Sequence, residues 1–251
     1  MVDQEGGHRH VTIPRDSWNQ SGSVHLFLGL GTTDQISMKI VASLTDQRDA
    51  PAASAAGADV LELRLDLMDG DPIKGVQECR KCTGLPVIAT LRSTQEGGRY
   101  SGNEDEWFRI IQPVIPHADY IDIERRFSAH ADTIRTHDVG IIASCHTLEM
   151  PSLFELFGLE RELLAFGDIP KIVVTPRQDE DIIEMISFTH AAKKPICTGV
   201  MGDRFRYARL VLPLFGSEFV YCHFGTPTAE GQYSVAEVKE AMRLFGLDAR
   251  V

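Results

Sequence analysis

The stretch Asp168-Ile169-Pro170-Lys171-Ile172-Val173-Val174-Thr175 places a lysine at the head of a short, β-branched apolar run. Such a run is typical of a buried strand, where an ammonium group loses its hydration unless it is paired or used in chemistry. The chain contains only seven lysines, and the other six fall at a strand entry or on segments typical of helices and loops. Lys171 is therefore either a strand-end lysine whose charged end reaches water or a desolvated amine that attacks a carbonyl and forms a Schiff base.

Strand-like runs alternate with helix-like stretches on both sides of this segment. The strands are predicted at 39–44, 60–65, 86–91, 120–124, 139–144, 171–175, 195–198 and 219–223. The helices are predicted at 48–57, 72–82, 104–116, 127–136, 151–166, 179–191, 204–214 and 234–246. This alternation indicates an α/β protein with a parallel sheet, and eight units in so short a chain favour a closed (β/α)8 TIM barrel over an open doubly wound sheet. No G-x-G-x-x-G follows the first strand, so the fingerprint of a dinucleotide-binding fold is absent.

Two of the predicted helices begin with a capping box, Asn103 with Glu106 and Ser234 with Glu237. Residues 1–37 are polar and rich in glycine and serine, and we expect a flexible N-terminal extension or residues upstream of the natural start. Met38 directly precedes the first convincing strand. Residues 38–251 are therefore predicted to form one catalytic barrel domain.

Composition excludes several classes of function. The formal net charge of −11 and the lack of any basic run argue against nucleic-acid binding, so an anionic substrate would need a local cationic pocket. No apolar stretch is long enough to cross a bilayer, and the N-terminus has acidic residues and histidines where a signal peptide would have a basic start. The five cysteines are scattered, as expected of free thiols in a reducing compartment, and the one close pair, Cys79 and Cys82, lacks a second pair at zinc spacing. We predict a cytoplasmic protein with no membrane partner and no metal.

The active site of a TIM barrel lies at the carboxyl ends of its strands, so polar residues at those positions are the candidates. Glu62, Arg64 and Asp66 alternate along one strand and should face inward, either as a structural layer of ion pairs or as a ligand-binding network. His146 ends another strand and is either a satisfied core histidine or the proton carrier that Schiff-base chemistry requires. Arg92 and Arg209 are either solvated loop residues or the cationic pocket for a carboxylate substrate.

The order and spacing of these residues resemble the type I 3-dehydroquinase family over about residues 38–245. The motifs are Glu62-Leu-Arg64-Leu-Asp66, Leu91-Arg92 followed by Glu96-Gly97-Gly98, Ser144-x-His146, Lys171-Ile172-Val173, Arg209-Leu210 with Gly216-Ser217, and Gly231-Gln232-Tyr233-Ser234. The resemblance implies a cofactor-free dehydration of 3-dehydroquinate to 3-dehydroshikimate, in the shikimate pathway of aromatic amino-acid biosynthesis. It also implies a homodimer.

The resemblance assigns a role to each candidate residue. Lys171 would form the imine, His146 would move the proton, and Glu96 would orient His146. Arg209 would bind the substrate carboxylate. The remaining residues would hold substrate hydroxyls and order the pocket: Glu62, Arg64, Arg92, Thr228 and Gln232.

Three positions depart from the pattern of the family. Thr228 stands where serine is common, Glu230 stands where proline is common, and residues 201–204 differ from the usual loop of small residues. The loss of proline is expected to loosen the loop that closes the site. Two other functions remain open at this point. A class I aldolase would also use a lysine on the sixth strand, but many such aldolases bind a substrate phosphate where this chain has Arg209 and Gln232. A non-catalytic binding barrel would be expected to have lost Lys171, His146 or Arg209.

Overall fold

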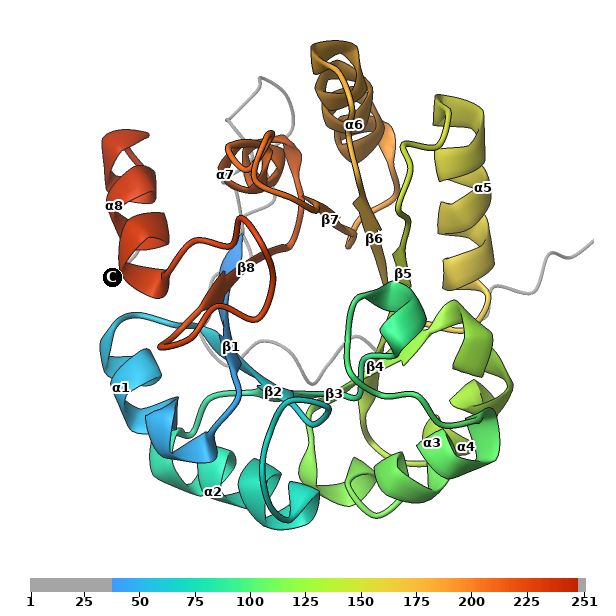
Figure 1. Ribbon diagram of the computed structural model, residues 1–251, viewed down its shortest axis with the longest axis vertical. Helices are drawn as coiled ribbons and strands as arrows, with labels where there is room; N and C mark the ends of the chain where they lie inside the picture. The colour runs from blue at the N-terminus through green and yellow to red at the C-terminus, as the bar shows by residue number, and fades with distance from the viewer. Residues whose placement is uncertain (1–37, 248–251) are drawn as a thin grey trace, which may run out of the picture. The chain divides into compact units, whose positions relative to one another are not determined.

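The computed structural model describes residues 38–247, which form a ring of parallel strands surrounded by helices (Figure 1). The strands are β1 (Lys39–Leu44), β2 (Val60–Arg64), β3 (Val87–Thr90), β4 (Tyr120–Glu124), β5 (Gly140–His146), β6 (Ile169–Val174), β7 (Cys197–Val200) and β8 (Phe219–His223). The α-helices are α1 (Ala50–Ala55), α2 (Pro72–Thr83), α3 (Glu104–Ile111), α4 (Ala131–Ile134), α5 (Leu153–Leu164), α6 (Asp179–Ala191), α7 (Ala208–Val211) and α8 (Val235–Leu244). Short 3-10 helices are η1 (Gln47–Asp49), η2 (Thr94–Glu96), η3 (Ile115–His117), η4 (Arg125–His130) and η5 (Leu212–Phe215).

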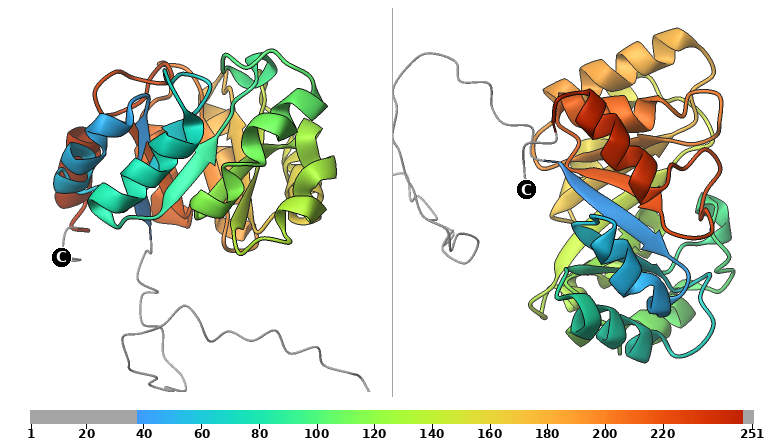
Figure 2. Two further views of the ribbon diagram at one scale, coloured as in Figure 1. Left: turned by 90° about the horizontal axis from the view of Figure 1, so that it is seen from below. Right: turned by 90° about the vertical axis from the view of Figure 1, so that its left-hand side faces the viewer.

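The strands pair in the order β7-β6-β5-β4-β3-β2-β1-β8, which nearly closes the barrel. Figure 2 gives two side views, in which helices flank the strands. Within residues 38–247, β7 and β8 share no ladder, but two contacts join them where they begin. The amide of Glu218 donates to the carbonyl of Ile196 at 2.7 Å, and the buried Ser217 hydroxyl accepts from the amide of Thr198 at 2.9 Å. The predicted (β/α)8 TIM barrel is confirmed, with a seam between its seventh and eighth strands.

The interior of the barrel has an apolar floor. Alternate strand residues point inward, and the first inward position of most strands carries an apolar side chain. These residues form one buried cluster: Val41, Val60, Ile88, Ile142, Ile169, Cys197 and Phe219. The next inward positions toward the carboxyl ends are largely polar and include Glu62, Asp122 and Lys171. The apolar floor therefore supports a polar layer, and the outward-facing residues pack against the helices in two larger clusters.

The strand bounds correct the expected position of Lys171. Strand β6 begins at Ile169, so Lys171 is its third residue and not its head. Pro170 lies inside the strand opposite Ala143, and Lys171 pairs in register with Ser144 and Cys197. The lysine is 4% exposed. The interpretation of a strand-end lysine reaching water is therefore wrong, because Lys171 lies within the barrel.

The two predicted capping boxes are present, whereas α7 begins later than predicted. Asn103 with Glu106 and Ser234 with Glu237 form the two predicted capping boxes. Helix α7 begins at Ala208 and not near residue 204, because turns occupy the segment before it. The expected flexible extension at 1–37 lies outside the described residues. Among residues 38–247 no helix is both long and apolar enough to cross a membrane.

Candidate active site

One pocket opens at the carboxyl ends of the strands and brings together all nine residues singled out from the sequence. It encloses about 820 Å³, counting the part open to solvent, which is the size of a small-molecule site. The predicted residues among its lining are Glu62, Arg64, Arg92, Glu96, His146, Lys171, Arg209, Thr228 and Gln232. The strands β2, β3, β5 and β6 or the loops after them supply six of these, and α7 and the β8–α8 loop supply the others. Their roles remain predictions.

Lys171 lies among groups that favour a charged amine. Its Nζ donates to Asp122 Oδ2 at 3.0 Å and lies 3.9 Å from Glu62 Oε1. The ring of Tyr221 faces the same nitrogen, with its centroid 3.8 Å away. All of these contacts stabilise positive charge on Nζ. These contacts favour the charged form of the amine, whereas an attack on a carbonyl requires the uncharged form.

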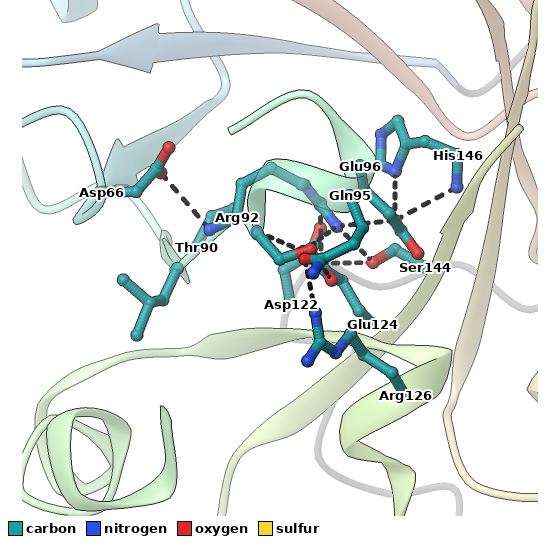
Figure 3. A network of polar contacts seen from close by, with 12 residues as sticks. Asp66, Thr90, Arg92, Gln95, Glu96, Asp122, Glu124, Arg126, Ser144 and His146 are labelled. Carbon is teal, nitrogen blue, oxygen red and sulfur yellow. Dashed lines mark hydrogen bonds and ion pairs between the residues drawn. The ribbon is translucent and has the colours of Figure 1, made fainter. Parts of the chain in front are cut away.

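Arg92 is the centre of a buried ion-pair network (Figure 3). Its Nη2 donates to Asp122 at 2.9 Å, and its Nη1 lies 3.2 Å from Glu96 and 3.3 Å from Glu124. The Ser144 hydroxyl accepts from Nη1 at 2.9 Å and donates to Asp122 at 2.5 Å. Four fixed partners around one guanidinium require the planar, many-donor geometry of arginine. Arg92 thus orders the carboxylates behind the pocket and has few donors left for substrate.

Glu96 and His146 form the second polar unit of the pocket. One carboxylate oxygen of Glu96 lies 2.7 Å from His146 Nδ1 and accepts from the His146 amide at 3.1 Å. Figure 3 shows both contacts, with Arg92 on the other side of the carboxylate. An ionised Glu96 assigns the hydrogen to Nδ1, which leaves Nε2 with a lone pair. This is the arrangement of an oriented general base.

Burial and neighbouring charges set the ionisation of these groups. Burial raises the pKa of Glu96 to about 7, although Arg92 acts in the opposite direction. Burial and the nearby cations Arg92 and Lys171 lower the pKa of His146 well below its usual value. Burial would raise the pKa of Asp122, but Arg92 and Lys171 outweigh it and lower that pKa. At neutral pH, Asp122 is therefore anionic and His146 is a neutral imidazole able to accept a proton.

A chain of hydrogen bonds ties the loop after β8 to the interior of the barrel. The amide and hydroxyl of Thr228 donate to Gln232 Oε1 at 3.0 and 2.9 Å, and Gln232 Nε2 donates to the Ser43 hydroxyl at 3.4 Å. Ser43 donates to Glu62 at 2.5 Å, and Thr90 donates to the other Glu62 oxygen at 2.9 Å. Thr228 and Gln232 thus order the loop and, through Ser43, orient Glu62 beside Lys171.

Arg209 lines the pocket and has a donor without a partner among the described residues. Its Nη2 donates to the carbonyl of Glu230 at 3.1 Å, and its buried Nε has no hydrogen-bond partner among the described residues. Burial and the neighbouring Arg206 lower the pKa of Arg209 to about 10, so the guanidinium stays charged at neutral pH. A buried charge with open donors is costly unless an anion completes it. Arg209 therefore has the properties of a carboxylate-binding group.

Two contacts fix the β8–α8 loop, although Glu230 stands where proline is common in the family. The carbonyl of Glu230 is the acceptor for Arg209, and Gly231 has φ +72°, where a Cβ would lie 2.4 Å from the Gly202 carbonyl oxygen. Glycine at 231 thus permits close approach of the loops that follow β7 and β8.

The guanidinium of Arg64 is already paired within the protein, because it makes two hydrogen bonds to Asp66 at 2.8 and 2.9 Å.

Sequence reasoning gave no role to two residues that contact Lys171. Asp122 was recognisable as a strand-end carboxylate, but nothing in the sequence says that it accepts from Lys171. Tyr221 was not recognisable as a site residue, because an aromatic residue in a strand is normally interpreted as part of the hydrophobic core. Both contacts depend on which strands are neighbours across the barrel, and single-strand patterns do not contain this information.

Comparison with known proteins identifies the family of this chain. The family model described as type I 3-dehydroquinase matches residues 36–249. The chain belongs to this family. A 3-dehydroquinate dehydratase of Methanoregula boonei is 57% identical over 208 residues, which are 83% of this chain and 100% of that protein. One from Methanospirillum hungatei is 40% identical over 202 residues, which are 80% of this chain and 79% of that protein.

A solved structure agrees with the family assignment. The crystal structure of the 3-dehydroquinate dehydratase from Aquifex aeolicus has a TM-score of 0.74 and 28% sequence identity, and the match covers 85% of this chain and 100% of that one. The predicted resemblance to the type I 3-dehydroquinase family, the barrel fold and the enzyme class, a hydro-lyase, are confirmed.

Proposed function

We propose that this member of the type I 3-dehydroquinase family dehydrates 3-dehydroquinate to 3-dehydroshikimate, in the shikimate pathway, through an imine on Lys171. The observation that carries the proposal is the single pocket that holds a buried lysine, a neutral histidine oriented by a carboxylate, and an arginine with open donors. A ketone that also bears a carboxylate matches this set, because the lysine attacks the ketone and the arginine binds the carboxylate.

The first stage of the reaction forms the imine. The uncharged Nζ of Lys171 attacks the ketone carbon. The carbonyl oxygen then takes up one proton from the nitrogen and the proton that the ammonium group had first given up, and it leaves as water, so that a protonated imine links enzyme and substrate. Its positive nitrogen draws electrons from the adjacent carbon. Asp122, which accepts from Nζ at 3.0 Å, is the nearest group to receive the proton that the amine must lose.

The second stage moves one proton through His146. Its Nε2 takes the proton from the carbon next to the imine, and the C–H electron pair moves into an enamine. The enamine then expels the substrate hydroxyl, which takes the same proton from His146 and leaves as water. Proton removal and delivery by one group on one face give a syn elimination. Hydrolysis of the remaining imine releases the product and the free lysine, and the net change is the loss of one water from the substrate.

The other residues support this sequence. Glu96 stabilises the imidazolium that forms on His146, as a carboxylate bonded to the far ring nitrogen does. Arg209 binds the substrate carboxylate. The remaining residues shape the pocket through the contacts that they make with their neighbours, and they contact the substrate hydroxyls where their donors and acceptors remain free. They are Glu62, Arg64, Arg92, Thr228 and Gln232.

The two alternative functions have less support. A class I aldolase that acts on phosphorylated substrates needs a phosphate site after β7 and β8, where this chain presents Arg209 and the Thr228–Gln232 contact. A binding barrel would have no need for the pairing of a neutral histidine with a carboxylate. Family membership argues against both.

Three finer properties belong to the same proposal. We place the enzyme in the cytoplasm, because all five cysteines are free and four of them are buried. We propose a homodimer from the resemblance to the family. We also propose that residues 38–251 form one catalytic domain.

Borohydride reduction in the presence of 3-dehydroquinate tests the proposal. Reduction turns the imine into a stable amine, so intact-mass and peptide mass spectrometry should find the mass of substrate or dehydrated product on the peptide that contains Lys171. Lys171→Ala should give no adduct at that peptide, whereas Lys193→Ala, which removes an exposed lysine, should give the wild-type adduct. A folded wild-type protein that forms no adduct, or an adduct on another lysine, would overturn the proposed mechanism.

A further inference from the structure

The ring of Tyr221, on β8, contacts the amine of Lys171, on β6. Its centroid lies 3.8 Å from Nζ, well inside the range of about 6 Å for a cation–π contact. Tyr221 lies on β8 at the second inward position, above Phe219, and its ring also lines the pocket. Asp122 holds the same nitrogen at 3.0 Å. Lys171 Nζ therefore has a carboxylate from β4 and a π face from β8 as its partners.

The hydroxyl of Tyr221 takes no part in any of these contacts. It is buried and has no hydrogen-bond partner among residues 38–247. A buried tyrosine hydroxyl normally finds a partner, because an unsatisfied one costs free energy. Burial raises the pKa of Tyr221 well above its usual value, so the ring is neutral at any working pH. The ring alone interacts with Lys171, and phenylalanine could supply the same face.

We propose that the ring of Tyr221 is a positioning group for Lys171, whose π face stabilises positive charge on Nζ and holds that nitrogen at the base of the pocket. This applies to the free protein. Under the proposed function it applies also to the protonated imine, because the nitrogen stays attached to the same side chain and is again positive. The residue is thus placed to keep the imine charged, which is the state that withdraws electrons from the substrate.

The contribution of Tyr221 must be separated from those of the other groups around Lys171. These groups come from several strands around the barrel: Glu62 on β2, Arg92 after β3, Asp122 on β4, His146 on β5, Cys197 on β7 and Tyr221 on β8. Asp122 and Glu62 favour the charged amine, while Arg92 opposes it. Because these groups remain in place when only position 221 is changed, a shift between variants reports the ring.

The titration of the Lys171 amine in the free enzyme tests the proposal without any substrate. Lysine labelled with 13C at Cε gives one signal for each of the seven lysines, and Lys171→Met assigns the signal of interest. Tyr221→Leu should lower the titration midpoint of Lys171 by about 0.5 to 1 pH unit, the size of a lost cation–π contact. Tyr221→Phe should restore the wild-type midpoint, because the ring is kept. An unchanged midpoint in Tyr221→Leu would overturn the proposal, as would a loss in Tyr221→Phe equal to that in Tyr221→Leu.

Two further measurements separate a charge effect from a packing effect. Phenylalanines with increasing ring fluorination at position 221 keep the ring shape and weaken its negative face, so the midpoint should fall stepwise with fluorination. This series keeps the test valid if Tyr221→Leu does not fold. Tyr120→Leu is the matched control, since Tyr120 packs on the same apolar floor and its ring makes an edge-to-face contact with Phe219. A Lys171 midpoint that moves as much in Tyr120→Leu as in Tyr221→Leu would assign the effect to packing and overturn the proposal.

The catalytic consequence rests on the proposed function and has its own readout. Tyr221→Leu should lower kcat by about 3- to 10-fold with little change in KM, since the ring contacts the lysine and not the substrate carboxylate. Absence of any imine in the wild-type enzyme would remove this consequence and the proposed mechanism together. The titration in the free enzyme would still decide whether the ring holds the amine.

Discussion

The two sides of the pocket differ in how completely their polar groups are paired. On the side formed by β2 to β5, Arg92 pairs with three carboxylates, Arg64 pairs with Asp66, and Glu96 holds His146. The lining on the side formed by β6 to β8 is mostly apolar or small: Val173, Cys197, Gly199, Met201, Phe219, Val220 and Tyr221. Besides Lys171, the cation that lines this side is Arg209, whose guanidinium donates to the carbonyl of Glu230.

This difference in pairing suggests different roles for the two sides of the pocket. A fully paired network is rigid, and it fixes the ionisation and the orientation of the groups that move protons. An arginine with open donors is completed only when a carboxylate arrives, so binding energy is available there. Under the proposed function, the paired side would serve the chemistry and the apolar side would serve substrate capture, with Lys171 between them. Substitutions on the two sides should therefore fail in different ways.

The largest effect on catalysis is expected from His146→Ala on the paired side. The variant lacks the proton carrier, so kcat should fall by about 10²- to 10⁴-fold. Borohydride should still trap substrate on Lys171, because imine formation needs the amine and not the imidazole. Single-turnover kinetics and trapping on the same sample measure both. Near-normal turnover would show that another group carries the proton, and loss of trapping would place His146 in imine formation as well.

The largest effect on stability is expected from Arg92→Leu. Removal of the cation leaves Asp122, Glu96 and Glu124 buried with one another, and breaking a buried pair in this way costs about 3 to 5 kcal/mol. Urea unfolding measures the loss. Arg125→Leu is the matched control, since Arg125 makes one exposed ion pair with Glu162 at 3.2 Å and should change stability by about 1 kcal/mol or less. Equal losses in the two variants would contradict the division between a paired and an open side.

The sequence predicted the barrel and its pocket because both follow from repeating patterns. Eight apolar runs at regular spacing predict the strands, and a parallel barrel necessarily gathers their carboxyl ends, so His146 and Lys171 could be placed together without a structure. The pairing of specific atoms could not be predicted in this way. That Asp122 and Tyr221 contact Lys171 depends on the stagger of strands separated by many residues. The start of β6 was also missed, because proline at 170 reads as a strand break although the parallel ladder accommodates it.

Arg209→Ala should weaken the capture of substrate on the open side. The lost contact is charge-assisted and two-pronged at best, so KM should rise by about 10- to 100-fold with a smaller change in kcat. Steady-state kinetics measure this split. Arg204→Ala removes an equal charge from an exposed position near the same loop and should leave KM within about 2-fold. A similar rise in both variants would mean that general attraction of the anion, and not a seated carboxylate, is what Arg209 provides.

The smallest and most specific effect concerns the pH dependence set by Glu96. Burial raises the pKa of Glu96 to about 7, whereas the pKa of His146 lies well below its usual value. As pH falls through about 7, Glu96 gains a proton and no longer stabilises the imidazolium, while His146 itself stays neutral. The acid limb of kcat should therefore lie near pH 7 and belong to the glutamate. Glu96→Gln has no carboxylate to titrate, so this limb should disappear. The value of kcat at higher pH should fall by about 10-fold, because the imidazolium loses its charged hydrogen-bond partner. A limb that stays near pH 7 in Glu96→Gln would assign it to another group, and the paired side would then not control the ionisation of its own base.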